Sequence, residues 1–361
     1  MAIVANTFQT PSALGNREEL SNVVNRITPE DTPIYSMMGK GTCTSTNPEW
    51  EIDVLADPVE NKHVEGDEFS YSSVTPVTRV GNATQIFRKS FIVSKTQDKI
   101  SNAGSAEQTK YQTLKKGVEL RKDIELALVS NTPTVKTGTR TFGALPTWLE
   151  TNTLRDPGLD ANGDGDFSDA GDRATVAADG GFSSGVTTVY TAGTVRRAFT
   201  KALMDEMLEK TYAAGADVKH MVLSPYAKRK FSGFMSDASL TGQRTQIQSG
   251  QATLIGAADM YQSDFGMISV VPNRVMRGNP ETASGSEETL RATQRERAAN
   301  VFFIDPSMLE FKWLRPIQKV TDVAIKSDAT PTVMIGEGTL CVKNEAGLGV
   351  IGDIFGTSDT K

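Results

Sequence analysis

Hydrophobic residues recur with helical spacing most clearly over residues 106–129. Tyr111, Leu114 and Val118 fall on one face of a helix drawn through this segment, while lysines and acidic residues fill the opposite side. Such a one-sided pattern is typical of a helix that buries a single stripe. Thr132-Pro133 follows, and a proline disfavours helix in the residue before it. We therefore predict one long helix, whose apolar face widens near its C-terminal end through Leu120, Ile124, Ala127 and Leu128.

Shorter periodic segments surround this helix. Thr32-Pro33 is typical of a helix start, so a short capped helix is expected there, ended by Gly39. Another helix is expected from Thr194, as N-cap, through Ala214, with Gly215 as the residue after its C-cap. Short apolar runs bounded by turn residues predict strands. The remaining predictions are a helix over 225–234 and strands over 84–94, 218–223, 267–271, 301–304, 332–343 and 348–355, with 344–347 as the turn between the last two.

Residues 57–80 show no helical period and little apolar content. Pro58, Gly66-Asp67 and Pro76 separate extended pieces, which predicts an exposed hairpin with its tip near residues 65–68. Its few large apolar residues are too sparse to form a core, so we expect them to lie on a neighbouring molecule or in solvent. These residues are Val59, Val64, Phe69, Tyr71 and Val74.

The order of the elements predicts an α+β fold without internal repeats. One unit is expected to combine residues 84–150 with 301–361, and a second unit, centred on 186–276, lies between them in sequence. Residues 155–185 differ in composition, since aspartate, glycine, alanine and serine dominate there and large apolar residues are few. We interpret that segment as an inserted surface loop.

Composition narrows the classes of function. The chain has 361 residues, of which 38% are hydrophobic and 7% aromatic, and its formal net charge is −6. This hydrophobic content is lean for a compact enzyme and fits an extended molecule with much polar surface. The acidic balance argues against a dedicated nucleic-acid binder, which needs a basic stripe for phosphates. The sequence shows no signal peptide and no membrane span, so the protein is expected to be made and kept in the cytosol.

Cysteine and serine patterns offer little chemistry. Cys43 and Cys341 belong to no CxxC pair and neighbour no histidine, so both are predicted to be free thiols. Gly181-Phe182-Ser183-Ser184-Gly185 matches the GxSxG pattern of a nucleophile elbow, which needs a strand before the serine and a helix after it. Here the pattern follows a loop of small residues, and only His63 and His220 are available as a base. We interpret it as a flexible linker and keep a hydrolase that uses Ser183 as a rival hypothesis.

An acidic stretch over residues 160–168 reproduces the start of a calcium loop. Oxygen ligands stand at alternate positions and a glycine follows, because several hard oxygens must wrap one cation at short range. The pattern departs at its end, where Gly171 replaces the bidentate acid and Asp169 and Asp172 flank it. The segment is either a calcium site or an acidic solvated loop, and no other cofactor is expected. The candidate ligands are Asp160, Asn162, Asp164, Asp166 and Asp172.

Short motifs spread over nearly the whole chain occur in a specific order. The first half contains Asn16-Arg17-Glu18-Glu19-Leu20 and Ile27-Thr28-Pro29-Glu30-Asp31-Thr32-Pro33, and the second half contains Ser263-Asp264-Phe265-Gly266 and Leu314-Arg315-Pro316. Together they resemble the HK97-like major capsid proteins of tailed phages, specifically the SU10-type family. The other matching motifs are Asn82-Ala83-Thr84-Gln85-Ile86, Tyr111-Gln112-Thr113-Leu114-Lys115-Lys116, Glu119-Leu120-Arg121-Lys122-Asp123-Ile124-Glu125, Gly143-Ala144-Leu145-Pro146-Thr147-Trp148 and Val271-Pro272-Asn273-Arg274.

The resemblance implies the parts of an HK97-like subunit. The arm and the E-loop hairpin would lie on neighbouring subunits, the spine helix would run along a peripheral P-domain, and an axial A-domain would face the centre of each capsomer. In chain order the implied parts are an N-terminal arm over 1–56, an E-loop over 57–85, a P-domain over 86–154, an inserted acidic loop over 155–185, an A-domain over 186–300 and C-terminal strands over 301–361 that complete the P-domain.

The implied function is structural rather than enzymatic. Copies of the chain would self-assemble as hexamers and pentamers into an icosahedral head that encloses double-stranded DNA without sequence preference. Implied partners are a separate scaffolding protein, a portal protein and a cement or decoration protein, with no membrane; assembly would occur in the host cytoplasm and the product would be the virion. The resemblance also places Cys43 and Cys341 where an intersubunit disulfide of mature particles could form. A second rival is a calcium-dependent decoration or adhesion protein of the virion.

Overall fold

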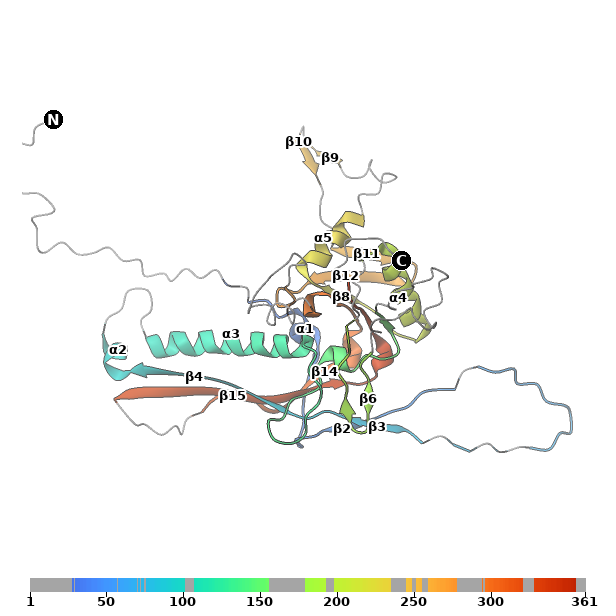
Figure 1. Cartoon of the computed structure of the whole chain (residues 1–361), viewed down its shortest axis with the longest axis horizontal. Helices are drawn as coiled ribbons and strands as arrows, with labels where there is room; N and C mark the ends of the chain where they lie inside the picture. Colours follow the sequence, from blue (N-terminus) through green and yellow to red (C-terminus); the bar gives the residue numbers. More distant parts are fainter. Residues whose placement is uncertain are drawn as a thin grey trace, which may run out of the picture.

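The computed structural model describes the chain in ranges separated by gaps. These ranges cover residues 28, 30–56, 58–69, 71, 73–74, 76–100, 107–155, 179–192, 198–234, 245–248, 251–254, 259–277, 294, 296–320 and 328–354. Within them, helices and strands form an elongated half and a rounded half (Figure 1). The chain passes from one half to the other between consecutive strands.

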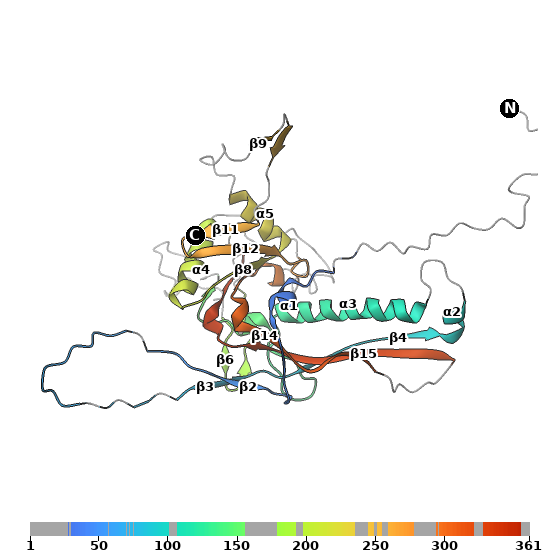
Figure 2. The ribbon, with the colours of Figure 1, turned by 180° about the vertical axis from the view of Figure 1, so that it is seen from behind.

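The elongated half consists of one long helix lying along a four-stranded sheet (Figures 1 and 2). The helix α3 covers Gln108–Val129, and the strand order is β1-β14-β15-β4. The strands β4 (Gln85–Ser94) and β15 (Ala329–Val342) pair antiparallel along the whole of β4. β14 (Leu309–Val320) pairs antiparallel with β15, and β1 (Gly39–Thr42) pairs parallel with β14.

The predicted long helix is confirmed, and its apolar face is buried in its C-terminal part. Leu120, Ile124 and Leu128 are fully buried and share a core cluster with Phe311 of β14 and Leu340 of β15. By contrast, Leu114 on the N-terminal part of the helix is 75% exposed. The widening apolar arc therefore marks the section of the helix that rests on the C-terminal strands.

A six-stranded mixed sheet forms the rounded half. Helices α4 and α5 cover one of its faces, where Met207, Phe231 and Phe303 belong to one buried cluster. Side chains of the opposite face, such as Val222 and Phe302, belong to the cluster below α3, so this sheet lies between two cores. Its order is β11 (Met260–Ser263), β12 (Gly266–Pro272), β8 (His220–Leu223), β13 (Val301–Ile304), β16 (Leu348–Ile351) and β5 (Thr153–Leu154), and the helices are α4 (Lys201–Ala213) and α5 (Pro225–Phe234).

The C-terminal strands divide between the two sheets, which corrects the expectation that residues 301–361 all complete the elongated half. β13 pairs with β8 and β16, and β16 pairs with β5, so both lie in the six-stranded sheet. Only β14 and β15 lie beside β4. The turn predicted over 344–347 exists as η5 (Glu345–Gly347), but it leads the chain from one sheet to the other instead of closing a hairpin.

The structure corrects one predicted helix start and confirms another. Helix α4 begins at Lys201, because Thr200 is extended and its hydroxyl accepts a hydrogen bond from the Leu203 amide at 3.4 Å, so Thr200 and not Thr194 is the N-cap. The expected end is confirmed, since Gly215 follows the C-cap with a positive φ of 86°. At α1 (Pro33–Met37), Thr32 occupies the N-cap position but makes no side-chain capping bond.

The predicted hairpin is longer than expected and starts earlier. β2 (Glu49–Ile52) and β3 (Thr78–Gly81) pair antiparallel, and residues 53–77 between them extend away from the body of the molecule, as Figure 1 shows. Residue 85 belongs to β4 and not to this hairpin. The remaining short elements are α2 (Lys95–Lys99), η2 (Leu145–Thr147), η4 (Pro306–Met308), β6 (Phe182–Ser183), β7 (Val186–Thr187), β9 (Thr245–Gln248) and β10 (Gln251–Leu254).

Candidate assembly surfaces

The segment 53–77, called the extended loop below, presents apolar side chains that its own chain does not cover. Leu55, Phe69, Tyr71 and Val74 are 87–94% exposed. A soluble monomer rarely leaves so many large apolar groups in water, and such groups mark contact surfaces. The full set of exposed large apolar residues in the loop is Val54, Leu55, Val59, Val64, Phe69, Tyr71, Val74 and Val77.

The stem of the extended loop is fixed firmly to the body. Trp50 of β2 donates its indole N–H to the backbone oxygen of Val342 at 2.9 Å, and its ring lies 5.6 Å from that of Trp148. Across the stem, Arg79 pairs with Glu49 at 2.5 Å. A partly buried indole with a satisfied N–H holds its strand in one orientation. The stem therefore sets the direction in which the loop leaves the molecule.

A buried carboxylate anchors the segment that precedes β1. Glu125 of α3 is fully buried and accepts hydrogen bonds from the backbone amides of Ile34 at 3.0 Å and Tyr35 at 2.8 Å. It also accepts one from Asn273 Nδ2 at 2.7 Å. Burial raises the pKa of this carboxyl, while the three hydrogen bonds and the nearby Lys40 oppose that rise. Burial also lowers the pKa of Lys40 to about 8, against the attraction of Glu125.

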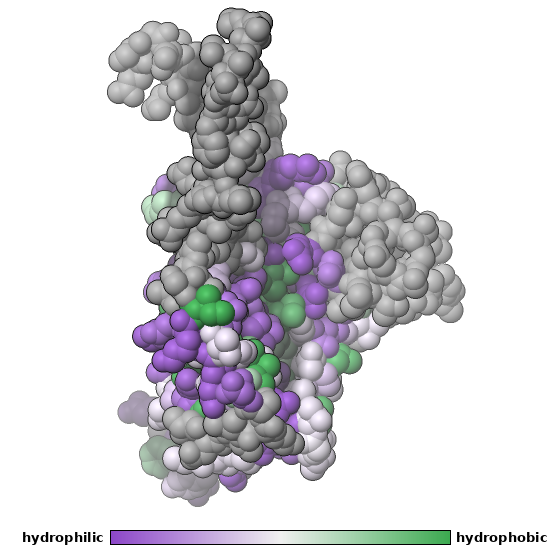
Figure 3. Space-filling view, turned by 90° about the vertical axis from the view of Figure 1, so that its left-hand side faces the viewer, coloured by the Kyte–Doolittle hydropathy of each residue, from purple (hydrophilic) through white to green (hydrophobic). Residues whose placement is uncertain are grey.

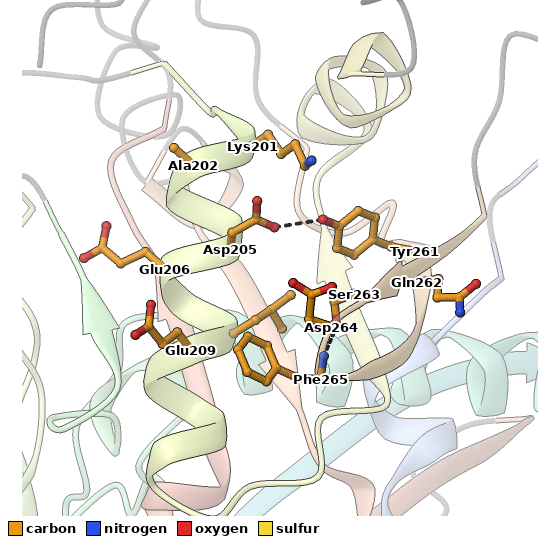
Figure 4. Close-up of a pocket in the computed structure, with 11 residues that line it drawn as sticks. Lys201, Ala202, Asp205, Glu206, Glu209, Tyr261, Gln262, Ser263, Asp264 and Phe265 are labelled. Carbon is orange, nitrogen blue, oxygen red and sulfur yellow. Dashed lines mark hydrogen bonds between the residues drawn. The ribbon is translucent and has the colours of Figure 1, made fainter. Parts of the chain in front are cut away.

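A groove with a volume of about 550 Å³ lies between α4 and the β11–β12 hairpin (Figure 4). Asp205 on α4 and Tyr261 on β11 meet across it, where the tyrosine hydroxyl donates to Asp205 Oδ1 at 2.8 Å. Burial, with the charge of Asp205, raises the pKa of Tyr261 to about 12. The exposed rings of Tyr212 and Phe265 pack together, 4.8 Å apart, and Phe265 lines the groove. The groove is thus an acidic surface with an aromatic border.

Apolar side chains are also exposed at the far end of the elongated half. Figure 3 views that end and shows green apolar side chains scattered among purple polar ones. Ile92 near the end of β4 and Ile100 just after α2 are 62% and 52% exposed. This surface is less apolar than the extended loop, and single exposed residues of this kind are common.

The GxSxG segment is a hairpin and not a nucleophile elbow. Phe182 pairs with Thr187 and Ser183 with Val186, so Ser184 and Gly185 form a two-residue turn, both with positive φ (52° and 84°). A strand follows the serine where an elbow needs a helix. In the described part of the chain, no hydrogen bond joins Ser183 to His63 or His220. The structure therefore does not favour the hydrolase hypothesis.

The predicted calcium ligands Asp160, Asn162, Asp164, Asp166 and Asp172 lie outside the described residues, so that site stays a prediction. Among the residues that are described, no group of three or more histidine, cysteine or acidic side chains is arranged to hold a metal ion. No helix in the same ranges is long and apolar enough to cross a membrane.

The residues on both sides of the 156–178 segment are joined by a buried arginine that sequence reasoning missed. Arg155 Nε pairs with Asp179 Oδ1 at 3.1 Å, and its guanidinium lies 3.8 Å over the ring of Tyr190. Asn300 contacts the same guanidinium at 3.5 Å. The ends of the segment are therefore held next to each other on the rounded half. A lone arginine before an acidic stretch was the signal available in the sequence.

The two cysteines are free thiols in the protomer. Cys43 is partly buried just after β1, whereas Cys341 on β15 is 1% exposed. Burial raises the pKa of both thiols, which keeps them protonated and weakly reactive. An intersubunit disulfide between them stays a prediction, and the burial of Cys341 argues against it, because β15 would have to open to expose its sulfur.

Comparison with protein families and curated proteins connects these surfaces to a known class. A family model described as SU10 major capsid protein matches residues 3–355. The major capsid protein of Escherichia phage Phieco32 is 26% identical over 325 residues, which covers 82% of this chain and 90% of that protein. Both matches span the elongated and the rounded half.

Solved capsid structures share the fold over nearly the whole chain. The capsid of cyanophage A-1(L) has a TM-score of 0.62 at 12% identity and covers 96% of this chain and 99% of its own. The capsid of a native GTA particle has a TM-score of 0.57 at 11% identity and covers 95% and 97%. These neighbours identify the α+β arrangement of long helix, paired long strands and rounded half as HK97-like. The chain belongs to the SU10 major capsid protein family.

Proposed function

We propose that copies of this chain close, as hexamers and pentamers, into an icosahedral head around double-stranded phage DNA. Membership of a major capsid protein family supports the structural role and the location in the virion. The observation that carries the proposal is the extended loop, whose apolar side chains the described part of the chain leaves exposed. In a closed shell each copy repeats the same contacts with its neighbours, and many modest contacts add to a stable particle.

Two substitutions on the extended loop test this role. Phe69→Ser and Tyr71→Ser together should abolish particle formation, because the loop loses apolar area that only a neighbour buries. The unassembled protomer should keep its unfolding midpoint, since both side chains are 87–94% exposed within it. Electron microscopy and sedimentation of the expressed protein, with its scaffolding partner, measure the particles.

Lys62→Ser provides the matched control, because Lys62 lies on the same loop and is similarly exposed but polar. This variant should assemble like the unmodified chain. Particles of normal yield from the Phe69/Tyr71 variant would contradict the role assigned to the loop.

We further propose that the chain has no catalytic activity. The hairpin geometry at Ser183 supports this, because a serine nucleophile needs a base within hydrogen-bond reach and an exposed elbow. An esterase assay on purified protomers would test it. Esterase activity of the unmodified protein that is lost in Ser183→Ala would contradict the proposal.

Partners beyond further copies of the chain are also part of the proposal. We expect a separate scaffolding protein and a portal protein during assembly in the host cytoplasm, and a cement or decoration protein on the finished shell. Packaged DNA would be confined rather than bound tightly, which fits the net charge of −6. Calcium binding by the acidic segment stays a prediction, which calorimetric titration of the protein with calcium would test.

A further inference from the structure

The groove between α4 and the β11–β12 hairpin carries negative charge that the described part of the chain does not balance. Glu206, Glu209 and Asp264 line it and are exposed, and among the described residues none of the three takes part in an ion pair. Asp205 adds a fourth carboxylate, held by Tyr261 at 2.8 Å. Among the described residues that line it, Lys201 is the single basic one. In Figure 4, Asp205 points from α4 toward Tyr261 of β11, whereas Glu206 and Glu209 project from α4 away from the β11–β12 hairpin.

Helix α5 carries the complementary charge. Arg229 and Lys230 are exposed on it, and within the described ranges neither has an acidic partner. Both lie near the ring of Tyr226, at 5.6 and 5.8 Å from its centroid, within the range of a cation–π contact. Lys228 differs, because it is only 15% exposed and already pairs with Asp259 at 2.9 Å. Two cationic groups that have no acidic partner in the described ranges therefore lie at consecutive positions on this helix.

The two charged surfaces lie on neighbouring parts of the same layer. Phe231 of α5 packs edge-on against Tyr261 at 6.1 Å, and Tyr261 lines the groove. A surface that matches a different surface of the same chain makes a head-to-tail contact between copies. Repetition of such a contact closes a ring. Opposite charges at these positions also orient the approach of the next copy.

We propose that the acidic groove of one subunit receives the α5 helix of the next copy, so that Arg229 and Lys230 face Glu206, Glu209 and Asp264 around each capsomer ring. The contact rests on the proposed assembly of this chain into hexamers and pentamers, and it names the side chains that join the rounded halves. The aromatic border of Tyr212 and Phe265 gives the long aliphatic parts of the two basic side chains an apolar surface to cover.

Charge reversal on either side should disrupt the rings. Glu206→Lys with Glu209→Lys, here the groove variant, places like charges against α5 of the neighbour. Arg229→Glu with Lys230→Glu, here the helix variant, places acidic side chains of α5 against the acidic groove of the neighbour. Each variant alone should lower the yield of particles by about tenfold or more, because juxtaposed like charges are strongly unfavourable at an interface. All four positions are exposed in the protomer, so its far-ultraviolet circular dichroism should not change.

Combining the changes distinguishes this contact from a general effect of charge. The quadruple variant exchanges the two signs and should assemble like the unmodified chain. Co-expression of the groove variant with the helix variant should restore six-membered rings, in which the two alternate. It should not restore five-membered rings, because an odd ring forces at least one like-charged contact. Negative-stain microscopy of isolated capsomers and shells reads out both results.

Asp217→Lys with Asp328→Lys is the control, since both acids are exposed, lie outside the groove and pair with the exposed Lys219 and Lys95. It should assemble normally. If the groove and helix variants also assemble normally, the contact is overturned, while particles from the unmodified chain keep the proposed function intact. If only the groove variant fails, a basic partner other than α5 occupies the groove and the contact is again overturned. An unmodified chain that forms no particles overturns the proposed function and this contact together.

Discussion

Glu125 shows how one residue organises distant parts of the chain. It interrupts the apolar face of α3 between Ile124 and Leu128, and the structure places it against the amides that open α1 and the side chain of Asn273. A buried carboxylate is costly unless hydrogen bonds replace its water, and here three donors do so. Residues far apart in sequence are thereby held at one point on the spine helix.

Substitution of Glu125 should distinguish its hydrogen bonds from its charge. Glu125→Ala should lower the free energy of unfolding of the protomer by about 1–3 kcal/mol or more, because buried amides of Ile34 and Tyr35 lose their acceptor. Glu125→Gln keeps one acceptor oxygen and a similar shape, so it should be the milder change. Urea unfolding followed by circular dichroism measures both.

The pH dependence of stability, compared between the unmodified protein and Glu125→Gln, tests the direction of the pKa shift. Burial raises the pKa of Glu125 above its ordinary 4.5, so between that value and the raised pKa the folded protein binds more protons than the unfolded chain. Its contribution to the free energy of unfolding is therefore full below 4.5 and falls as pH rises through the window. Glu125→Gln lacks this titration, so unmodified protein should lose stability relative to it with rising pH. A gain in relative stability over that window would contradict the direction.

At the scale of single elements, α3 and β14 behave differently. The period of α3 is visible in the sequence because its C-terminal stripe is buried in the same core as side chains of β14 and β15. β14 escaped prediction because Pro316 and several charged residues break its alternation. The structure accommodates that proline where the pairing with β15 shifts register, between Arg315 and Gln318. Proline lacks the N–H of a regular ladder and is tolerated at such irregularities.

The same leucine-to-alanine substitution at two positions of α3 measures how much side-chain burial contributes to the free energy of unfolding. Leu128→Ala should lower the free energy of unfolding by about 2–5 kcal/mol, because it leaves a cavity in the main core. Leu114→Ala, on the same helix but 75% exposed, should change it by no more than about 0.5 kcal/mol. Thermal or urea unfolding of both variants checks the difference. Equal effects would show that the two halves of the helix are packed alike.

The described part of the molecule has two main hydrophobic cores, and strands of one sheet contribute to both. The chain passes from β13 in the rounded half to β14 in the elongated half, and it returns from β15 to β16. The sheet of β8, β13 and β16 contributes side chains to both cores. Short connections and a common sheet couple the two halves, so they should unfold together.

Tryptophan fluorescence makes this coupling measurable. All three tryptophans, Trp50, Trp148 and Trp313, lie in or against the core of the elongated half. Phe231→Ala on α5 opens a cavity in the other core and should destabilise the protomer by about 3–5 kcal/mol. The fluorescence midpoint should fall together with the circular dichroism midpoint. A fluorescence transition that stays in place while the dichroism divides into two steps would show that the halves unfold separately.

Some features of this protein follow from local patterns, because they depend on neighbours within a few residues. The long helix, the strands over 84–94 and 301–304, the α5 helix and a loop too poor in apolar residues for a core of its own are all visible in the sequence. The ordered motifs along the chain also carried the SU10-type resemblance. Ser183 matched a pattern whose meaning depends on the next element, which is a strand here and not a helix.

Other features exist only once distant segments meet. Strand partners are chosen by long-range packing, so the sequence did not show that β13 and β16 leave the elongated half for the six-stranded sheet. Glu125 becomes an anchor only when α1 and Asn273 reach it. The acidic groove requires α4 and β11 side by side, about fifty residues apart in sequence, because only their packing brings Asp205 and Tyr261 together. Local propensity selects the elements, whereas burial and long-range hydrogen bonds decide how they combine into surfaces that another copy can contact.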